Sequence, residues 1–286
     1  MRFATTIAGV GEPTFLLLHG LGSTRRIWDL AVPHLAREHK VIAFDLRGHG
    51  ETEKPEAGYT LEDFAVDIDE LMRRYGVTRP ILVGHSAGAN AALHHAATRR
   101  TARGVVLVDG GLVEMHAHLS WADAAERLAP PPDDAYQIEK FVREGWPSVA
   151  NSPQLVEIRR SLFEWGKGGE IRKRLARERH LAILRSLWEQ DVHADLARLA
   201  CPALVIVCRM PLEKAPDQRW TEQKEFAATR IARLPRLRLE WSEDSIHDVP
   251  VQRPRDIAET ILAFAADVVA EEQGLQAAPS VASPRR

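Results

Sequence analysis

Short apolar runs alternate with longer amphipathic stretches along most of this chain. A continuous apolar run is typical of a strand buried on both faces of a parallel sheet, whereas apolar residues at helical spacing indicate a helix with one buried face. We therefore expect an α/β fold, with a mostly parallel, doubly wound sheet flanked by helices. The expected strands cover residues 3–8, 14–18, 40–44, 80–83, 104–108, 203–207 and 237–241, and the expected helices cover residues 27–38, 60–75, 87–98, 221–234 and 253–269.

The pattern changes between residues 112 and 198, where the chain becomes polar and helix-rich and contains no buried-strand run. Several prolines interrupt this stretch, and the alternation of strands and helices resumes after it. We predict a helical cap insertion at 112–198 within a core domain formed by residues 1–111 and 199–270. The last stretch, 271–286, is rich in Ala, Pro, Ser and Arg, which predicts a disordered tail.

Composition narrows the class of protein further. The 286 residues carry a formal net charge of −2, so no basic surface for nucleic acid or an anionic membrane is expected. The two cysteines, Cys201 and Cys208, are too few for a disulfide framework and favour a reducing compartment. No apolar run approaches the ~20 residues of a membrane span, and the N-terminus lacks an apolar signal core. We expect a cytoplasmic protein with a small-molecule partner, and the sequence leaves its oligomeric state open.

Residues 84–88 read Gly-His-Ser-Ala-Gly and join an expected strand to a helix of small residues. A strand, a Gly-x-Ser-x-Gly turn and a helix are what a nucleophile elbow requires. The turn is tight, and side chains at Gly84 and Gly88 would collide with the neighbouring strand or helix. The pattern predicts Ser86 at the tip of this turn, with its hydroxyl exposed above the sheet.

Three further landmarks accompany this turn, in an order that makes the set specific. With them the chain resembles the α/β-hydrolase superfamily, in its serine-nucleophile branch, from Thr14 to about Ala270. Members of this superfamily often have two strands before the strand that leads into the His-Gly loop, and this chain has room for one. The landmarks are His19-Gly20, Asp45-Leu46-Arg47-Gly48-His49-Gly50, the Ser86 turn and Ile246-His247-Asp248-Val249-Pro250.

The resemblance implies roles for these residues. A serine hydroxyl needs an adjacent base, and His247 stands where the superfamily has its catalytic histidine. The backbone amides of Leu21 and Ala87 are the expected oxyanion hole, because preorganised donors must meet the charge that develops on the substrate oxygen. The loop residues His19, Arg47 and His49 are expected to brace the site rather than to react.

The carboxylate that orients the histidine is harder to assign. In many relatives it follows the strand here placed at 203–207, but residues 208–212 contain no carboxylate. Asp109, at the end of the strand 104–108, is the first candidate because some relatives place their acid there. Glu213 and Asp217 are the alternatives, and a Ser-His dyad or an impaired site is left open. Asp248 is expected to point away from the histidine ring.

The expected function is a cofactor-free serine hydrolase that cleaves an ester, thioester or lactone with an apolar acyl group. A serine at the elbow argues against the epoxide hydrolase and haloalkane dehalogenase branches, whose nucleophile is a carboxylate. The alternatives are a non-catalytic ligand-binding relative and a C–C hydrolase or perhydrolase that uses the same Ser-His pair. No metal is expected, because His116 and His118 lack a matching ligand cluster.

Two features of the predicted cap remain. Arg172 to Arg179 is interpreted as a solvated helix face. Four cap tryptophans are expected to pack the insertion onto the core, with one or two of them lining a substrate pocket; they are Trp121, Trp146, Trp165 and Trp188.

Overall fold

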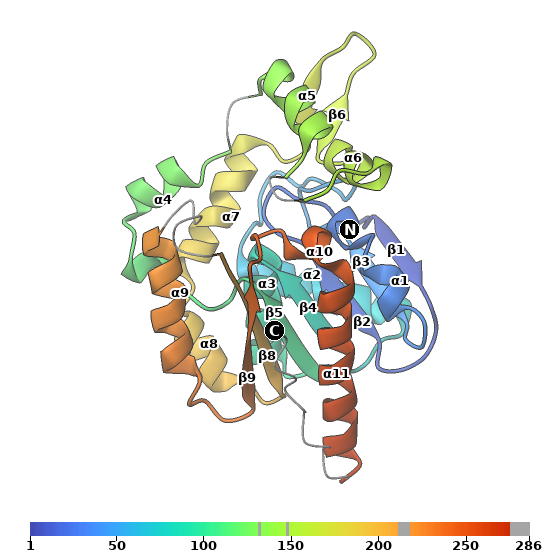
Figure 1. The fold of residues 1–286 in the computed structure, drawn as a ribbon, viewed down its shortest axis with the longest axis vertical. Helices are drawn as coiled ribbons and strands as arrows, with labels where there is room; N and C mark the ends of the chain where they lie inside the picture. Colours follow the sequence, from blue (N-terminus) through green and yellow to red (C-terminus); the bar gives the residue numbers. More distant parts are fainter. Residues whose placement is uncertain (131–132, 147–148, 211–217, 275–286) are drawn as a thin grey trace.

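A seven-stranded sheet forms the centre of the computed structural model, which describes residues 1–130, 133–146, 149–210 and 218–274. The strand order is β1-β3-β2-β4-β5-β8-β9 (Figure 1). β1 is antiparallel to β3, and every other pair in this sheet is parallel. The predicted sheet is thus confirmed, with one strand, β1, before the strand that leads into the His-Gly loop. The strands are β1 Thr5–Ala8, β2 Phe15–Leu18, β3 Val41–Phe44, β4 Ile81–His85, β5 Gly104–Val108, β8 Ala203–Arg209 and β9 Leu237–Glu243.

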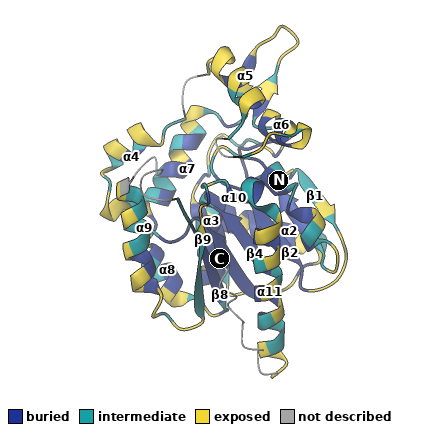
Figure 2. Cartoon of the chain, in the orientation of Figure 1, coloured by how far each residue is buried: buried dark blue, intermediate teal, exposed yellow. Residues whose placement is uncertain are grey.

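Helices cover both faces of the sheet, which explains why the inner strands β2, β3, β4 and β5 are buried along their whole length (Figure 2). Alternate residues of β2 point into two separate cores, Leu16 and Leu18 into one and Phe15 and Leu17 into the other, and all four are fully buried. The first core also holds residues of α2 Leu61–Tyr75, α3 Ala87–Arg99, α8 Val192–Arg198 and α9 Gln218–Ile231. The second core holds residues of α1 Val32–Leu35 and α11 Pro254–Glu272.

Helix α2 begins and ends as its sequence predicts. The Thr60 hydroxyl accepts from the Asp63 amide, and the Asp63 carboxylate accepts from the Thr60 amide, which forms a capping box. Gly76 ends the helix in the left-handed conformation, with φ of 64°.

Two predicted helices differ from the structure. Residues 27–38 do not form one helix but a 3-10 turn, η1 Arg25–Trp28, followed by the single turn of α1. Pro33 is the physical reason, because proline fits only the first turn of a helix. The predicted helix 253–269 begins after a separate turn, α10 Val249–Gln252, and extends to Glu272. The predicted tail therefore starts within α11, and residues 275–286 lie outside the described part of the chain.

The segments between β5 and α8 lie largely beyond one end of the sheet, whereas α8 packs beside the sheet against α3 (Figure 1). This stretch also contains a short antiparallel hairpin of β6 and β7, which the expected helical insertion did not include. Each of its strands buries only one residue of three, so neither produces a buried-strand run. Arg172 and Lys173 therefore belong to a strand, and only the part of the run 172–179 from Arg177 onward lies on a helix, as was expected for the whole run. The division into core and cap stays a prediction. The segments are η2 Met115–Ala117, α4 Trp121–Arg127, α5 Ala135–Glu144, α6 Pro153–Arg160, β6 Phe163–Trp165, β7 Ile171–Lys173 and α7 Arg177–Glu189.

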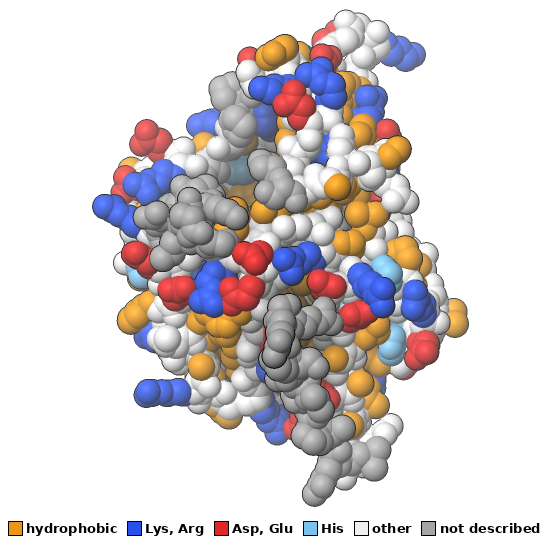
Figure 3. Space-filling view, viewed as in Figure 1, with side chains coloured by type: hydrophobic (Ala, Val, Ile, Leu, Met, Phe, Trp, Pro, Cys, Tyr) orange, Lys and Arg blue, Asp and Glu red, His pale blue; other side chains and the backbone are white. Residues whose placement is uncertain are grey.

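Two surface properties bear on partners. None of the described helices has both the length and the apolar character needed to cross a bilayer. On the face seen in Figure 3, the described side chains of both charge signs are interspersed with apolar ones.

Candidate active site

The turn at Ser86 joins β4 to α3 and holds its serine in a strained conformation. Ser86 has φ of 54° and ψ of −123°, values that a residue with a side chain rarely adopts. A Cβ at Gly84 would lie 2.2 Å from the Gly88 carbonyl oxygen, and one at Gly88 would lie 2.6 Å from the oxygens of Leu18 and His19. The glycines thus allow the close approach of strand and helix that lifts Ser86 above the sheet.

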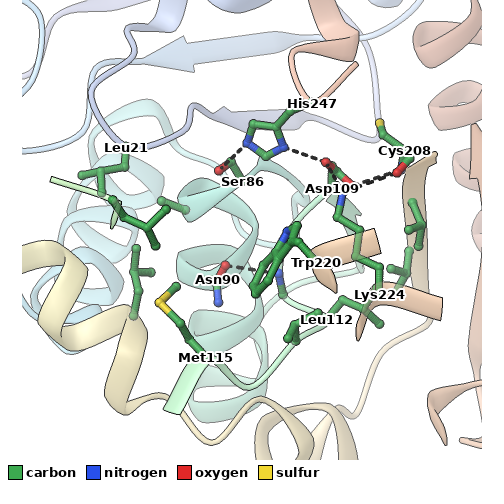
Figure 4. A pocket seen from close by; sticks show the side chains of 18 of the residues that line it. Leu21, Ser86, Asn90, Asp109, Leu112, Met115, Cys208, Trp220, Lys224 and His247 are labelled. Atoms are coloured by element: carbon green, nitrogen blue, oxygen red, sulfur yellow. Dashed lines mark hydrogen bonds and ion pairs between the residues drawn. The ribbon is translucent and has the colours of Figure 1, made fainter. Parts of the chain in front are cut away.

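Three side chains that are distant in sequence form one chain of hydrogen bonds (Figure 4). His247 Nε2 lies 2.9 Å from Ser86 Oγ, and His247 Nδ1 lies 2.6 Å from Asp109 Oδ2. Ser86 follows β4, Asp109 follows β5 and His247 follows β9. The carboxyl ends of parallel strands meet at one edge of a sheet, which brings these three residues together.

The carboxylate of Asp109 is fully buried and accepts from two further donors, which make three contacts with it. The Cys208 amide donates to Oδ1 at 3.0 Å, and Lys224 Nζ lies 2.7 Å from Oδ1 and 2.8 Å from Oδ2. Burial raises the pKa of Asp109, but the hydrogen bond and charge of His247, together with Lys224, outweigh burial and lower that pKa to about 2. The carboxylate is therefore ionised at neutral pH.

Asp248, although next to His247 in sequence, does not hold this position. Asp248 accepts from the indole N–H of Trp146 at 2.7 Å, so its carboxylate is engaged on another side. Glu213 and Asp217 lie outside the described residues.

His247 is held through its backbone as well as its ring. His85 Nε2–H donates to the His247 carbonyl at 2.9 Å, and the two rings lie 4.9 Å apart between centroids. Burial lowers the pKa of His85 to about 4, so this ring is neutral. For His247, burial lowers the pKa, but the hydrogen bond and charge of Asp109 outweigh it and raise the pKa above 6.5. Its side chain remains 52% exposed, which limits the effect of burial.

Two neutral histidines fix the glycine-rich loop after β2. The Leu46 amide donates to His19 Nε2 at 2.9 Å, which places the proton on Nδ1, and Nδ1–H donates to the Gly20 carbonyl at 2.8 Å. In the same way, the Gly22 amide donates to His49 Nε2 at 3.1 Å. Burial lowers the pKa to about 4 for His19 and to about 3 for His49, so both remain acceptors at neutral pH.

The second landmark loop, residues 45–50, is also anchored. Arg47 donates from Nε and Nη2 to both carboxylate oxygens of Asp67, each at 2.6 Å. Such bidentate geometry fixes the guanidinium plane and, with it, the loop that carries His49.

Ser86 opens into a cavity of about 470 Å³. Leu21 and Ala87, whose amides were the expected oxyanion donors, line it beside the serine. Polar side chains in the wall are bonded to protein: Asn90 Nδ2 donates to Gln190 at 2.6 Å, and His180 Nε2–H donates to the Leu128 carbonyl at 2.8 Å. The remaining wall is mainly apolar and includes Leu112, Val113, Met115, Leu184 and Leu187 (Figure 4).

Three residues of the site were not predicted from the sequence: His85, Trp220 and Lys224. Of these, only His85 could have been predicted, because it lies within the Gly-x-Ser-x-Gly motif. Trp220 and Lys224 line the cavity from α9. A lysine on a helix with many polar residues is ordinarily expected to face solvent, so the sequence does not distinguish Lys224. The expectation that one or two of the four tryptophans of the predicted cap line a substrate pocket is wrong for this cavity, because none of the four is among its lining residues. Trp121 and Trp188 pack against each other, with ring centroids 6.1 Å apart, and Trp146 packs on Phe141 at 5.7 Å.

No cluster of three or more potential metal ligands occurs among the described residues. His116 Nδ1 instead lies 3.1 Å from the Trp188 carbonyl oxygen.

The known proteins that this chain resembles have the same fold. The model of the alpha/beta hydrolase family matches residues 15–260. A 2-(acetamidomethylene)succinate hydrolase of Mesorhizobium japonicum is 39% identical over 98 residues, 34% of this chain and 35% of that protein. The Karrikin insensitive 2 receptor CA of Petunia hybrida is 39% identical over 87 residues, 29% of this chain and 32% of that protein. Both matches thus span about a third of the relative's length.

A crystal structure of E-2-(acetamidomethylene)succinate hydrolase superposes with a TM-score of 0.74 and 24% sequence identity, covering 92% of this chain and 94% of that one. Identity at this level shows the fold alone. Together with the match of the family model over most of the chain, it establishes that the chain belongs to the α/β-hydrolase family. Hydrolases are among the relatives that the chain matches.

Proposed function

We propose that this chain is a cofactor-free serine hydrolase that cleaves a carboxylic ester, thioester or lactone. The observation that carries the proposal is the unbroken line of hydrogen bonds Ser86–His247–Asp109 beside a largely apolar cavity. A serine nucleophile needs a base in contact with its hydroxyl, and that base needs a carboxylate on its far nitrogen. Both contacts are present.

In the first half-reaction, Ser86 Oγ attacks the acyl carbon while His247 Nε2 takes the hydroxyl proton. The ionised Asp109 stabilises the imidazolium that forms. The Leu21 and Ala87 amides donate to the oxyanion of the tetrahedral intermediate. That intermediate collapses, the bond to the leaving alcohol or thiol breaks, and His247 returns the proton to the leaving group.

In the second half-reaction, water attacks the acyl group on Ser86 and gives a proton to His247. The carboxylic acid departs, and the proton returns to Ser86 Oγ. In a lactone, acid and alcohol remain in one molecule. The cavity supports an apolar acyl or ring group, because its polar wall residues Asn90 and His180 already have protein partners.

A panel of p-nitrophenyl esters of graded chain length, with lactones and acyl thioesters, tests the proposal. We expect turnover of at least one class, and a loss of about 10³-fold or more in kcat for Ser86→Ala. Turnover that survives Ser86→Ala would contradict the proposal. If Ser86 is reactive but no acyl substrate is cleaved, the C–C hydrolase or perhydrolase alternative is favoured instead.

A second candidate is a small-ligand receptor without turnover. The observation in its favour is that one of the relatives is described as a receptor. It predicts saturable binding of small apolar ligands in the same cavity, without Ser86-dependent product.

A further inference from the structure

The ammonium group of Lys224 makes three hydrogen bonds at the Asp109 end of the line Ser86–His247–Asp109. Its Nζ lies 2.7 Å from Asp109 Oδ1, 2.8 Å from Asp109 Oδ2 and 3.3 Å from the Cys208 carbonyl oxygen. The side chain of Lys224 is 15% exposed and that of Asp109 is 0% exposed. The pair is therefore buried, where an ion pair is screened little by solvent. Among the described residues, Lys224 is the cation that contacts both oxygens of this carboxylate.

One oxygen of Asp109 is shared between two donors. Oδ2 accepts from His247 Nδ1 at 2.6 Å and from Lys224 Nζ at 2.8 Å. Figure 4 shows the two donors approaching the carboxylate from different sides, His247 from the loop after β9 and Lys224 from α9. The imidazole thus interacts with a carboxylate that a fixed positive charge already partly compensates.

We propose that Lys224 is a positioning residue that sets the basicity of His247 by holding the carboxylate of Asp109 between the two cations. The proposal rests on the function proposed above for the same site. An imidazolium beside a lysine–carboxylate pair gains less stabilisation than one beside a carboxylate alone. Lys224 therefore lowers the pKa of His247, so that the imidazole remains deprotonated down to a lower pH. It also keeps the buried Asp109 ionised and in place.

The other titratable groups that face His247 do not replace Lys224. His85, from β4, is neutral because burial lowers its pKa to about 4. The thiol of Cys208, from β8, is neutral because burial raises its pKa. Asp248 acts in the opposite direction, since its negative charge raises the pKa of His247, whereas Lys224 lowers it.

The test compares Lys224→Gln with Lys224→Arg, which retains the charge, and with Arg230→Gln, which removes a charge from an exposed position of the same helix. The first readout is the pKa of His247, measured by NMR on labelled imidazole in a Ser86→Ala background. The second is the acidic limb of the kcat/KM profile with Ser86 intact. For Lys224→Gln we expect both to move upward by roughly 1 pH unit. Lys224→Arg should stay close to the wild-type values because it retains the charge, and Arg230→Gln should not differ from wild type.

A His247 pKa that is unchanged in folded Lys224→Gln would overturn the proposal. Should that variant fail to fold, the chemical shift of Lys224 ¹⁵Nζ in the unmodified protein decides: it is expected to change as His247 is protonated, and a chemical shift that stays constant through the His247 titration would also overturn the proposal. Because the NMR titration does not depend on turnover, it separates this proposal from the proposed function. Absence of Ser86-dependent hydrolysis with a shifted pKa would reject the function and leave the role of Lys224 standing.

Discussion

The imidazole of His247 and the carboxylate of Asp109 are 2.6 Å apart between Nδ1 and Oδ2, although β8 lies between their two strands in the sheet. The loop after β9 therefore crosses the end of β8 to reach Asp109. At that end β8 contributes the Cys208 amide, which donates to Asp109 at 3.0 Å. The end of β8 thus supports an acid supplied by β5, which explains how residues 208–210 can lack a carboxylate.

Asp109→Asn is expected to lower kcat by about 10³- to 10⁴-fold. The amide can donate to His247 Nδ1, which favours the wrong tautomer, and it no longer stabilises the imidazolium. Steady-state kinetics on the best substrate of the ester panel measures the effect.

The matched control for Asp109→Asn is Asp248→Asn, which removes a carboxylate next to His247 that bonds to Trp146 instead. We expect a loss below about 10-fold there, and likewise little effect of Glu213→Gln. A large loss in Glu213→Gln with little loss in Asp109→Asn would show that the acid is assigned to the wrong residue.

The pH profile of kcat/KM should have an acidic limb above 6.5. Asp109 raises the pKa of His247 above that value, and the base works only when it is deprotonated, so activity falls as pH decreases through the raised pKa. Residual activity in Asp109→Asn should show its limb at lower pH, since the group that raises the pKa is gone. A wild-type limb near pH 5 would disagree with this geometry.

Gly84→Ala should destabilise the fold strongly, by roughly 3 kcal/mol or more, because its Cβ would lie 2.2 Å from the Gly88 carbonyl oxygen. Gly76→Ala serves as the comparison: it has a φ of +64° but no atom within 4 Å of its Cβ, so only the left-handed backbone costs about 1 kcal/mol. Chemical denaturation measures both free energies of unfolding. Equal losses would mean that steric crowding at the elbow is not what requires Gly84.

Met115→Trp should shorten the acyl chains that the cavity accepts. Met115 is partly buried against the core and points into the cavity (Figure 4), so a larger ring there occupies space that a long acyl group needs. In Met115→Trp the KM for long-chain esters should rise more than the KM for acetyl esters. The measured quantity is the ratio of kcat/KM for a long-chain ester to kcat/KM for an acetyl ester, which should fall below the wild-type ratio. Met115→Leu, of similar volume, should leave that ratio near wild type. An unchanged ratio in Met115→Trp would place the acyl group elsewhere.

Much of the fold could be predicted because buried parallel strands and capped helices leave strong local patterns. The run of β2 and the capping box of α2 are examples. The hairpin β6–β7 could not be predicted, because only Phe163 and Ile171 are buried in it. The helix expected over 27–38 failed at Pro33, where local chemistry overrides the apolar spacing.

For the candidate site, local motifs pointed to Ser86 and His247, but the acid depended on tertiary structure. Asp109 follows a strand as many aspartates do, and only the crossing of the loop after β9 brings it to His247. Lys224 left no sequence signal, because an ion pair across 115 positions is invisible to helical periodicity.

Covalent labelling is the most direct test of the proposal that Ser86 is an activated nucleophile. The folded protein is treated with a fluorophosphonate probe, and the modified peptide is identified by mass spectrometry, with Ser86→Ala and Asp109→Asn treated alongside. We expect a single adduct on Ser86, slower labelling in Asp109→Asn and none in Ser86→Ala. Folded wild-type protein that remains unlabelled, or an adduct on another residue, would contradict that proposal.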